Sequence, residues 1–203
     1  MSESEKILSG YVCAPYLHNH ESIEMKESWE HSKNVLKMYF ATATFSDDSK
    51  PYFSSATNHY LLAKFKNNQK MQKDVQKFNQ EKTSFLFNMD ENLFERESKG
   101  TMNFVSIYYL EYGDSDEDFK EIANVVGRRE KVGTAGIGHM DLYSTQPSKF
   151  TFPYSDHIVV LEVASEKSHQ SVNKYCEKTR RDVSRKGLTM NNLVSLSVLE
   201  KLK

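Results

Sequence analysis

NHYLLAKF at residues 58–65 and DHIVVLEV at residues 156–163 are the two stretches that decide the expected fold. Each starts with a polar residue and a histidine and continues as a short, nearly apolar run. Such runs are typical of central β-strands that are covered on both faces. The likeness of the two stretches indicates that one structural unit occurs twice in the chain.

Neighbouring segments match at a similar spacing. At an offset of 97 residues, ILSGY at residues 7–11 falls on FVSIY at residues 104–108, so that Tyr11 meets Tyr108. A register that holds over about 80 residues favours an internal duplication. The alternative is a chance coincidence of two similar patterns of strands and helices.

Both copies predict the same order of elements, β-α-β-β-α-β, which is the ferredoxin-like arrangement. Hydrophobic periodicity and turn residues define these elements. In the first copy the expected strands are 6–14, 39–45, 60–65 and 84–88, and the helices are 21–37 and 67–82. In the second copy the strands are 102–111, 134–143, 157–163 and 192–199, with helices around 119–126 and over 165–186. We expect a first repeat at 1–88, a linker at 89–100 and a second repeat at 101–203.

The expected fold class is α+β, with two tandem ferredoxin-like repeats that pack sheet on sheet as a single-chain α+β barrel. This arrangement resembles the dimeric α+β barrel superfamily. Its members include stress-response barrel proteins, EthD-type proteins, antibiotic-biosynthesis-type monooxygenases and chlorite-dismutase-like haem proteins. Most of them build the barrel from two chains, whereas one chain holds both halves here, so we expect a monomer or a homodimer. The resemblance is topological and implies a fold and no particular function.

Composition excludes several classes of protein. The chain has 203 residues, 12% of them aromatic, and a formal net charge of -1, which gives no reason to expect nucleic acid or an anionic membrane as partner. No apolar run approaches the roughly 20 residues that span a bilayer. The two cysteines, Cys13 and Cys176, form neither a disulfide framework nor a zinc motif. We therefore expect a cytoplasmic protein.

A catalytic site is predicted on one strand of the second copy. His139 and Asp141 alternate there, where the first copy has Thr42 and Thr44 at the 97-residue offset. We expect His139 to act as acid or base, Asp141 to orient it, and Tyr108 on a neighbouring strand to donate a hydrogen bond. The alternative is a mutually satisfied pair near a strand end, with Tyr108 as a core aromatic.

Four further residues are predicted to contact a ligand: Tyr11, Ser106, Tyr143 and His157. His157 corresponds to His59 at the start of the same strand in the other copy. Both histidines have a structural alternative, as polar residues that bond nearby loop backbone.

Two classes of function remain open. The first is a small-molecule enzyme or binder with cofactor-independent acid–base chemistry on a small, partly apolar substrate. The second is a non-catalytic barrel that binds a ligand or a protein. His18 and His20 beside Glu21 are a weak metal signal, so no metal site is expected. Haem is implied only by the resemblance to the α+β barrel superfamily. No axial histidine is identified in the sequence, so no cofactor is expected.

Overall fold

The computed structural model describes the backbone of residues 8–45, 57–80, 85–95, 103–111, 137–145, 157–168, 170 and 189–203. Within these ranges, side chains are described for residues 8–44, 57–80, 103–107, 160–168, 170 and 194–203. The helix expected around 119–126 and nearly all of the one expected over 165–186 lie outside the described residues. No helix within these ranges is long and apolar enough to cross a membrane.

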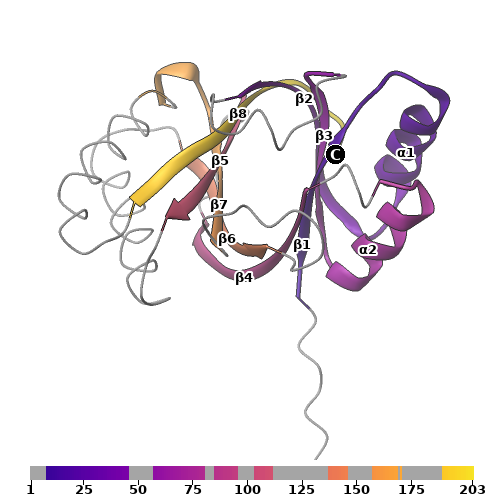
Figure 1. Cartoon of the computed structure of the whole chain (residues 1–203), viewed down its shortest axis with the longest axis horizontal. Coiled ribbons are helices and arrows are strands. Elements are labelled where there is room, and N and C mark those ends of the chain that lie inside the picture. The colour runs from indigo at the N-terminus through magenta and orange to yellow at the C-terminus, as the bar shows by residue number, and fades with distance from the viewer. Residues whose placement is uncertain are drawn as a thin grey trace, which may run out of the picture.

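Within the described residues, eight antiparallel strands close into a barrel, and two helices cover one side of it (Figure 1). The first half of the chain contributes β1 (Gly10–Pro15), α1 (His20–His31), β2 (Val35–Phe45), β3 (His59–Phe65), α2 (Asn68–Lys77) and β4 (Phe85–Glu95). The second half contributes β5 (Phe104–Glu111), β6 (Ile137–Thr145), β7 (His157–Val163) and β8 (Thr189–Lys201).

The strand order around the barrel is β1-β3-β2-β8-β5-β7-β6-β4. Each half therefore forms a sheet in which its own strands stand in the order fourth, first, third, second. Pairing of β2 with β8 and of β4 with β6 joins the two sheets at both edges. A closed barrel leaves no unpaired sheet edge, which removes a site of uncontrolled strand pairing.

The two halves share a β-bulge at the same place. The pairing of β2 with β3 shifts between Val35 and Lys37, and the pairing of β6 with β7 shifts between Ile137 and His139. A bulge adds one residue to one strand and turns the following side chains. Lys37 and His139 thus occupy equivalent positions, each immediately after a bulge.

The sequence suggested an offset of 97 with one residue of slippage, to 98, at the third strands, and the structure keeps only the value at the third strands. Phe65 of β3 pairs with Gly10, whereas Val163 of β7 pairs with Phe104. These ladders give offsets of 98 for the third strands and 94 for the first strands, and the bulges give 102 for the second strands. The equivalents of His139 and Asp141 are therefore Lys37 and Tyr39, not Thr42 and Thr44.

Several element boundaries also differ from expectation. α1 ends at His31, six residues before the predicted end, because Ser32 is extended (φ -69°, ψ 129°) and its N–H bonds the Trp29 carbonyl. Leu36, which falls inside the predicted helix, lies instead in β2 and is 42% exposed. β4 continues to Glu95, so the first part of the predicted linker, 89–100, is strand.

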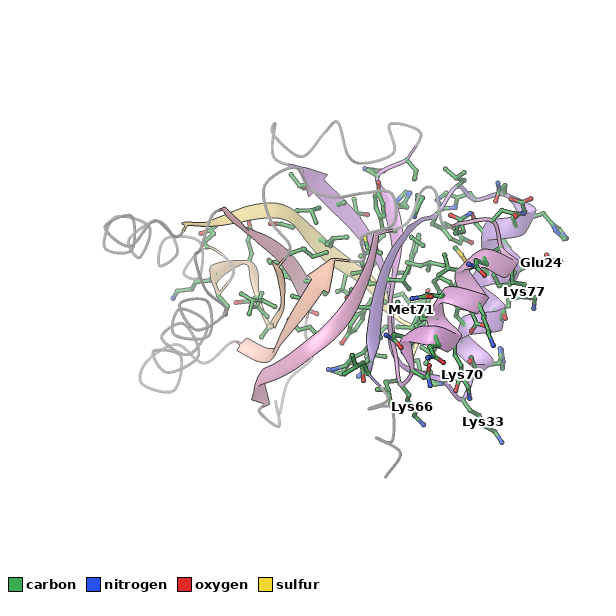
Figure 2. All side chains as sticks on the ribbon, turned by 60° about the horizontal axis from the view of Figure 1, so that its bottom comes forward. Glu24, Lys33, Lys66, Lys70, Met71 and Lys77 are labelled. Atoms are coloured by element: carbon green, nitrogen blue, oxygen red, sulfur yellow. The ribbon has the colours of Figure 1, made fainter. Side chains whose placement is uncertain are left out.

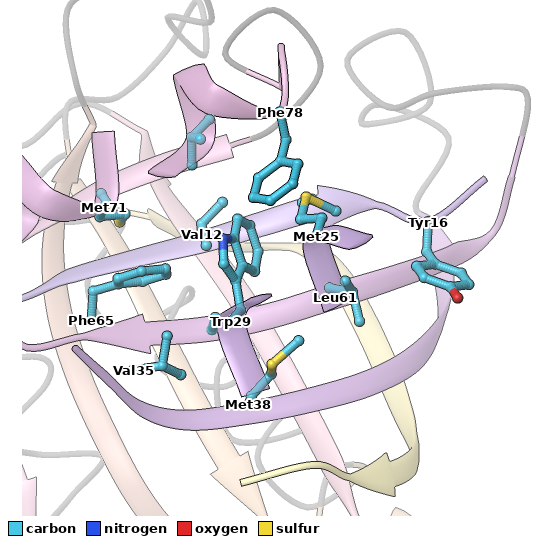
Figure 3. Close-up of a cluster of buried hydrophobic side chains, with 13 residues drawn as sticks. Val12, Tyr16, Met25, Trp29, Val35, Met38, Leu61, Phe65, Met71 and Phe78 are labelled. Carbon is cyan, nitrogen blue, oxygen red and sulfur yellow. The ribbon is translucent and has the colours of Figure 1, made fainter. Parts of the chain in front are cut away.

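Two hydrophobic cores lie on opposite faces of the first sheet. One fills the barrel interior, with side chains from both halves: Tyr11, Cys13, Tyr39, Ala41, Ala43, Tyr60, Leu62, Val105, Ile107, Val160, Val194 and Leu196. The other lies between the sheet and the helices and is centred on Trp29, which meets the Phe65 ring edge to face at 5.5 Å (Figure 3).

Charged side chains lie on the outer side of the helices, whereas the side chain of Met71 of α2 is buried against the strands (Figure 2). Lys70 and Lys77 of α2 extend away from the sheet. The amphipathic pattern of α2 therefore serves packing on its inner face and solvation on its outer face.

Gly10 should be intolerant of a side chain. A Cβ there would lie 2.6 Å from Met71 Cε and 3.2 Å from Asn68 Cα, so β1 and α2 approach too closely for a larger residue. We expect Gly10→Val to lower the free energy of unfolding by about 1–3 kcal/mol. Urea unfolding of Gly10→Val, Met71→Ala and the double variant tests this, because the smaller side chain should relieve part of the clash. Strict additivity of the two changes would contradict the packing.

Candidate functional site

A buried carboxylate lies inside the barrel. Glu162 is the one charged residue in the apolar strand β7 and is only 3% exposed. It stands two residues after Val160, which belongs to the interior core, so it lies on the same inward face. Burying a charge this deeply is costly unless partners compensate it.

Two side chains of β2 supply the compensation. Lys37 Nζ and Tyr39 Oη each lie 3.1 Å from Glu162 Oε2, and both donate to it. β2 and β7 are not neighbours in the strand order, so these bonds cross the barrel interior and connect its two halves. Because the Lys37 side chain is 33% exposed and that of Glu162 only 4%, the cluster runs from solvent into the interior.

The environment holds Tyr39 in its protonated form. Burial raises the pKa of the Tyr39 phenol, and the negative charge of Glu162 and the hydrogen bond to it raise it further. Tyr39 is therefore a fixed hydrogen-bond donor near neutral pH.

A second charged residue is buried on the opposite wall. Lys64 of β3 is 8% exposed and follows Leu62 of the interior core by two positions. It pairs in the ladders with Tyr11 on one side and Lys37 on the other. Lys64 is also the equivalent of Glu162 in the first half, so the two third strands present opposite charges to the interior.

Register divides the predicted site residues into two sets. His139, Asp141 and Tyr143 lie in β6, as the ladder partners of Glu162, Val160 and Ile158. Directly opposite residues share a face of an antiparallel sheet, so these three positions belong to inward rows. Tyr11 belongs with them, because it is buried in the interior core.

The other three predicted residues lie in outward rows. Tyr108 pairs with Val159, and His157 pairs with Ser144. In β7, Val159 and His157 are each one residue away from the inward positions 158 and 160, so these two pairs belong to outward rows. Ser106 is buried on the outward face, between Val105 and Ile107 of the interior core. β7 also separates β5 from β6, so the expectation that Tyr108 stands on a strand next to His139 was wrong. The ferredoxin-like crossover puts the third strand between the first and second.

Sequence reasoning missed Glu162, Lys37 and Tyr39. A signal for Glu162 was present: a single carboxylate interrupts an apolar strand at the position where the other copy has a lysine. No comparable signal marked the β2 residues, because the bulge that sets their register is not visible in the sequence.

The two histidines of the weak metal motif at residues 18–21 contact different partners in the structure. His20 Nδ1 lies 3.6 Å from Glu24 Oε1, whereas His18 bonds His59 of β3. Among the described residues, no three His, Cys, Asp or Glu side chains gather in a way that could hold a metal ion.

The fold matches solved structures over nearly its whole length. A candidate monooxygenase from Fusobacterium nucleatum superposes with a TM-score of 0.58 at 12% identity, covering 97% of this chain and 94% of the other. A heme-binding protein from Thermus thermophilus gives a TM-score of 0.56 at 8% identity, with 96% and 92% covered. A chlorite dismutase variant from Candidatus Nitrospira defluvii gives 0.54 at 8% identity, with 96% and 92% covered.

At these identities the likeness establishes the α+β barrel fold alone. No protein-family model matches the sequence, and no curated protein matches it.

Haem iron is commonly held by an imidazole, a thiolate or a phenolate. Cys13 is buried in the interior, and burial raises the pKa of its thiol, so it stays protonated. Tyr39 donates to Glu162, and His18 and His59 lie with Tyr16 and Phe40 on the outer face of the sheet, away from the barrel interior. Cys13, Tyr39, His18 and His59 are therefore not placed to ligate a haem inside the barrel.

The raised pKa of Tyr39 predicts a specific alkaline instability. Unfolded tyrosine ionises near pH 10, whereas folded Tyr39 does not, so its contribution is complete below about pH 10 and falls above it by about 1.4 kcal/mol per pH unit. Tyr39→Phe should be less stable than wild type at pH 8, and the difference should shrink by pH 11. Urea unfolding at both pH values measures it. A difference that is the same at both would contradict the assignment.

Proposed function

We propose that this chain is a small-molecule-binding α+β barrel that performs acid–base chemistry in its interior, without a bound cofactor, on a small and partly apolar substrate. The observation that carries the proposal is the buried Glu162 carboxylate. The bonds from Lys37 and Tyr39 both use Oε2. We assign Oε1, the oxygen that Lys37 and Tyr39 do not bond, as the atom through which Glu162 would meet a ligand.

The cluster suits the removal of a proton from an oxygen or an activated carbon. Glu162 Oε1 would take the proton, and the electron pair would stay on the substrate as an anion. The Lys37 ammonium and the Tyr39 hydroxyl, both within reach of the carboxylate, would stabilise that anion. The surrounding apolar side chains of the interior, such as Val105 and Leu62, favour a substrate with an apolar body.

His139 and Asp141 complete the proposed site from β6. His139 is the ladder partner of Glu162 and the equivalent of Lys37, so we assign it the role of a second acid or base at this end of the barrel. Asp141 would orient it. Tyr39 takes the place that the sequence suggested for Tyr108, and Tyr11 and Tyr143 would line the ligand.

We also infer that the chain arose by internal duplication. The shared strand order and the equivalent bulges at Lys37 and His139 support this. Since β4 reaches Glu95, the join between the repeats would follow that residue. One chain would then suffice for the barrel, as a monomer or within a homodimer.

Ligand screening of matched variants tests the function. The panel consists of small phenols, naphthols and enolisable ketones, and binding is followed by thermal shift and by calorimetry. We expect Glu162→Gln to weaken binding at least tenfold, because the amide cannot accept the proton. His139→Ala should abolish turnover or weaken binding while leaving the melting temperature nearly unchanged. Glu200→Gln, at an exposed position of β8, is the control and should bind like wild type.

Three outcomes would decide against parts of this proposal. If no member of the panel binds wild type, the interior is not a site for this class of molecule. Equal binding by wild type and Glu162→Gln would exclude the carboxylate. Binding without any chemical change of the ligand would support the alternative, a non-catalytic ligand-binding barrel.

A further inference from the structure

His18 and His59 meet on the outer side of the barrel, away from the interior cluster. His18 lies between β1 and α1, and His59 is the first residue of β3. His18 Nε2 and His59 Nδ1 are 3.0 Å apart. His18 is exposed and His59 half-buried, so the pair is accessible to solvent.

The backbones that carry the two rings are fixed to each other. Tyr16 N–H donates to the His59 carbonyl at 2.8 Å. Thr57 Oγ1 donates to the Tyr16 carbonyl and accepts from His59 N–H, both at 3.0 Å. Three hydrogen bonds thus hold the end of β1 against the start of β3, so the separation of the histidines is set by the fold.

Aromatic rings hold the imidazoles in place. The Tyr16 ring meets His18 edge to face at 4.7 Å, and the Phe40 ring stacks on His59 at 5.4 Å with an angle of 26°. Tyr16 belongs to the core between sheet and helices, and Phe40 packs against that core, so neighbouring side chains restrict both rings. Pre-positioned side chains lose little conformational entropy when they bind a ligand.

The backbone of His18 is strained. Its φ of 57° lies in the left-handed region, which is uncommon for a residue with a side chain. Hydrogen bonds on both sides maintain it, from Leu17 N–H to Ser22 Oγ at 3.0 Å and from Ser22 N–H to Asn19 Oδ1 at 2.9 Å. Strain of this kind persists where surrounding structure enforces it, and it concentrates at functional sites.

We propose that His18 Nε2 and His59 Nδ1 bind a divalent transition-metal ion of the Zn²⁺, Cu²⁺ or Ni²⁺ class. Metal–nitrogen bonds of about 2.0–2.1 Å put two adjacent ligand nitrogens roughly 3.0–3.4 Å apart. The observed separation of 3.0 Å already meets this requirement. The ring that now donates the hydrogen bond would move its proton to its other nitrogen, leaving both lone pairs for the metal with no net loss of protons.

The site would be an open one. Within the described residues no third His, Cys, Asp or Glu side chain joins the pair, and His20 instead faces Glu24. Water or a small ligand would fill the remaining positions, since His18 is exposed. Imidazole ligands favour Zn²⁺, Cu²⁺ and Ni²⁺ over Mg²⁺ and Ca²⁺, which prefer oxygen.

Calorimetric titration of the tag-free chain with ZnCl₂ and with CuCl₂ tests the proposal. His18→Asn removes one ligand while keeping a residue that tolerates the left-handed backbone, and His59→Gln removes the other. We expect the tightest equivalent of metal to bind at least tenfold more weakly in each variant. Copper EPR should show two nitrogen ligands in wild type and fewer in the variants. MgCl₂ should not bind at this site.

Two matched histidines serve as controls. His20 and His31 are exposed on α1, and His20→Gln and His31→Gln should retain the tightest equivalent. Circular dichroism checks that every variant is folded. An unchanged tightest equivalent in both His18→Asn and His59→Gln would overturn the proposal. So would an equal loss in the His20→Gln control, which would move the site to the helix.

Discussion

A single buried carboxylate links the two halves of the barrel. Glu162 lies almost entirely out of water, and an unpaired charge there would be costly. The partners that offset this cost, Lys37 and Tyr39, stand on a strand of the other half. The polar cluster therefore depends on the closed, packed barrel, which brings the strands of both halves around one interior. Burial and the negative charge of Glu162 in turn keep Tyr39 protonated.

The sequence was sufficient for the fold class and much of the strand pattern. The run at β7, His157–Val163, was predicted to the residue, because a continuous apolar stretch bounded by polar residues has few alternatives. The register of the strands could not be predicted from the sequence. The matched runs are nearly continuous in apolar residues and do not alternate strictly, so their sequences do not fix which residues are equivalent from strand to strand. The bulges before Lys37 and His139, which fix the true equivalence, leave no mark in composition.

The same limit explains what was found and missed at the candidate site. His139 and Asp141 stood out as ionisable residues alternating on a strand, and their ladder partners lie on the inward face. Glu162 was overlooked because one charge in a strand more often points to solvent, and only the closed barrel makes its face an interior. Tyr108 was expected near His139, but strand order is a property of the chain path and not of either strand alone.

The most direct test of this account is the coupling between Lys37 and Glu162 across the barrel. A double-mutant cycle with Lys37→Met, Glu162→Gln and the double variant, followed by urea unfolding at neutral pH, measures it. We predict a coupling free energy of about 1–3 kcal/mol, because the single change at Lys37 leaves the buried carboxylate without its cation and the second change relieves that cost. Additivity within about 0.3–0.5 kcal/mol would contradict the account, since the two halves would then not depend on this interaction.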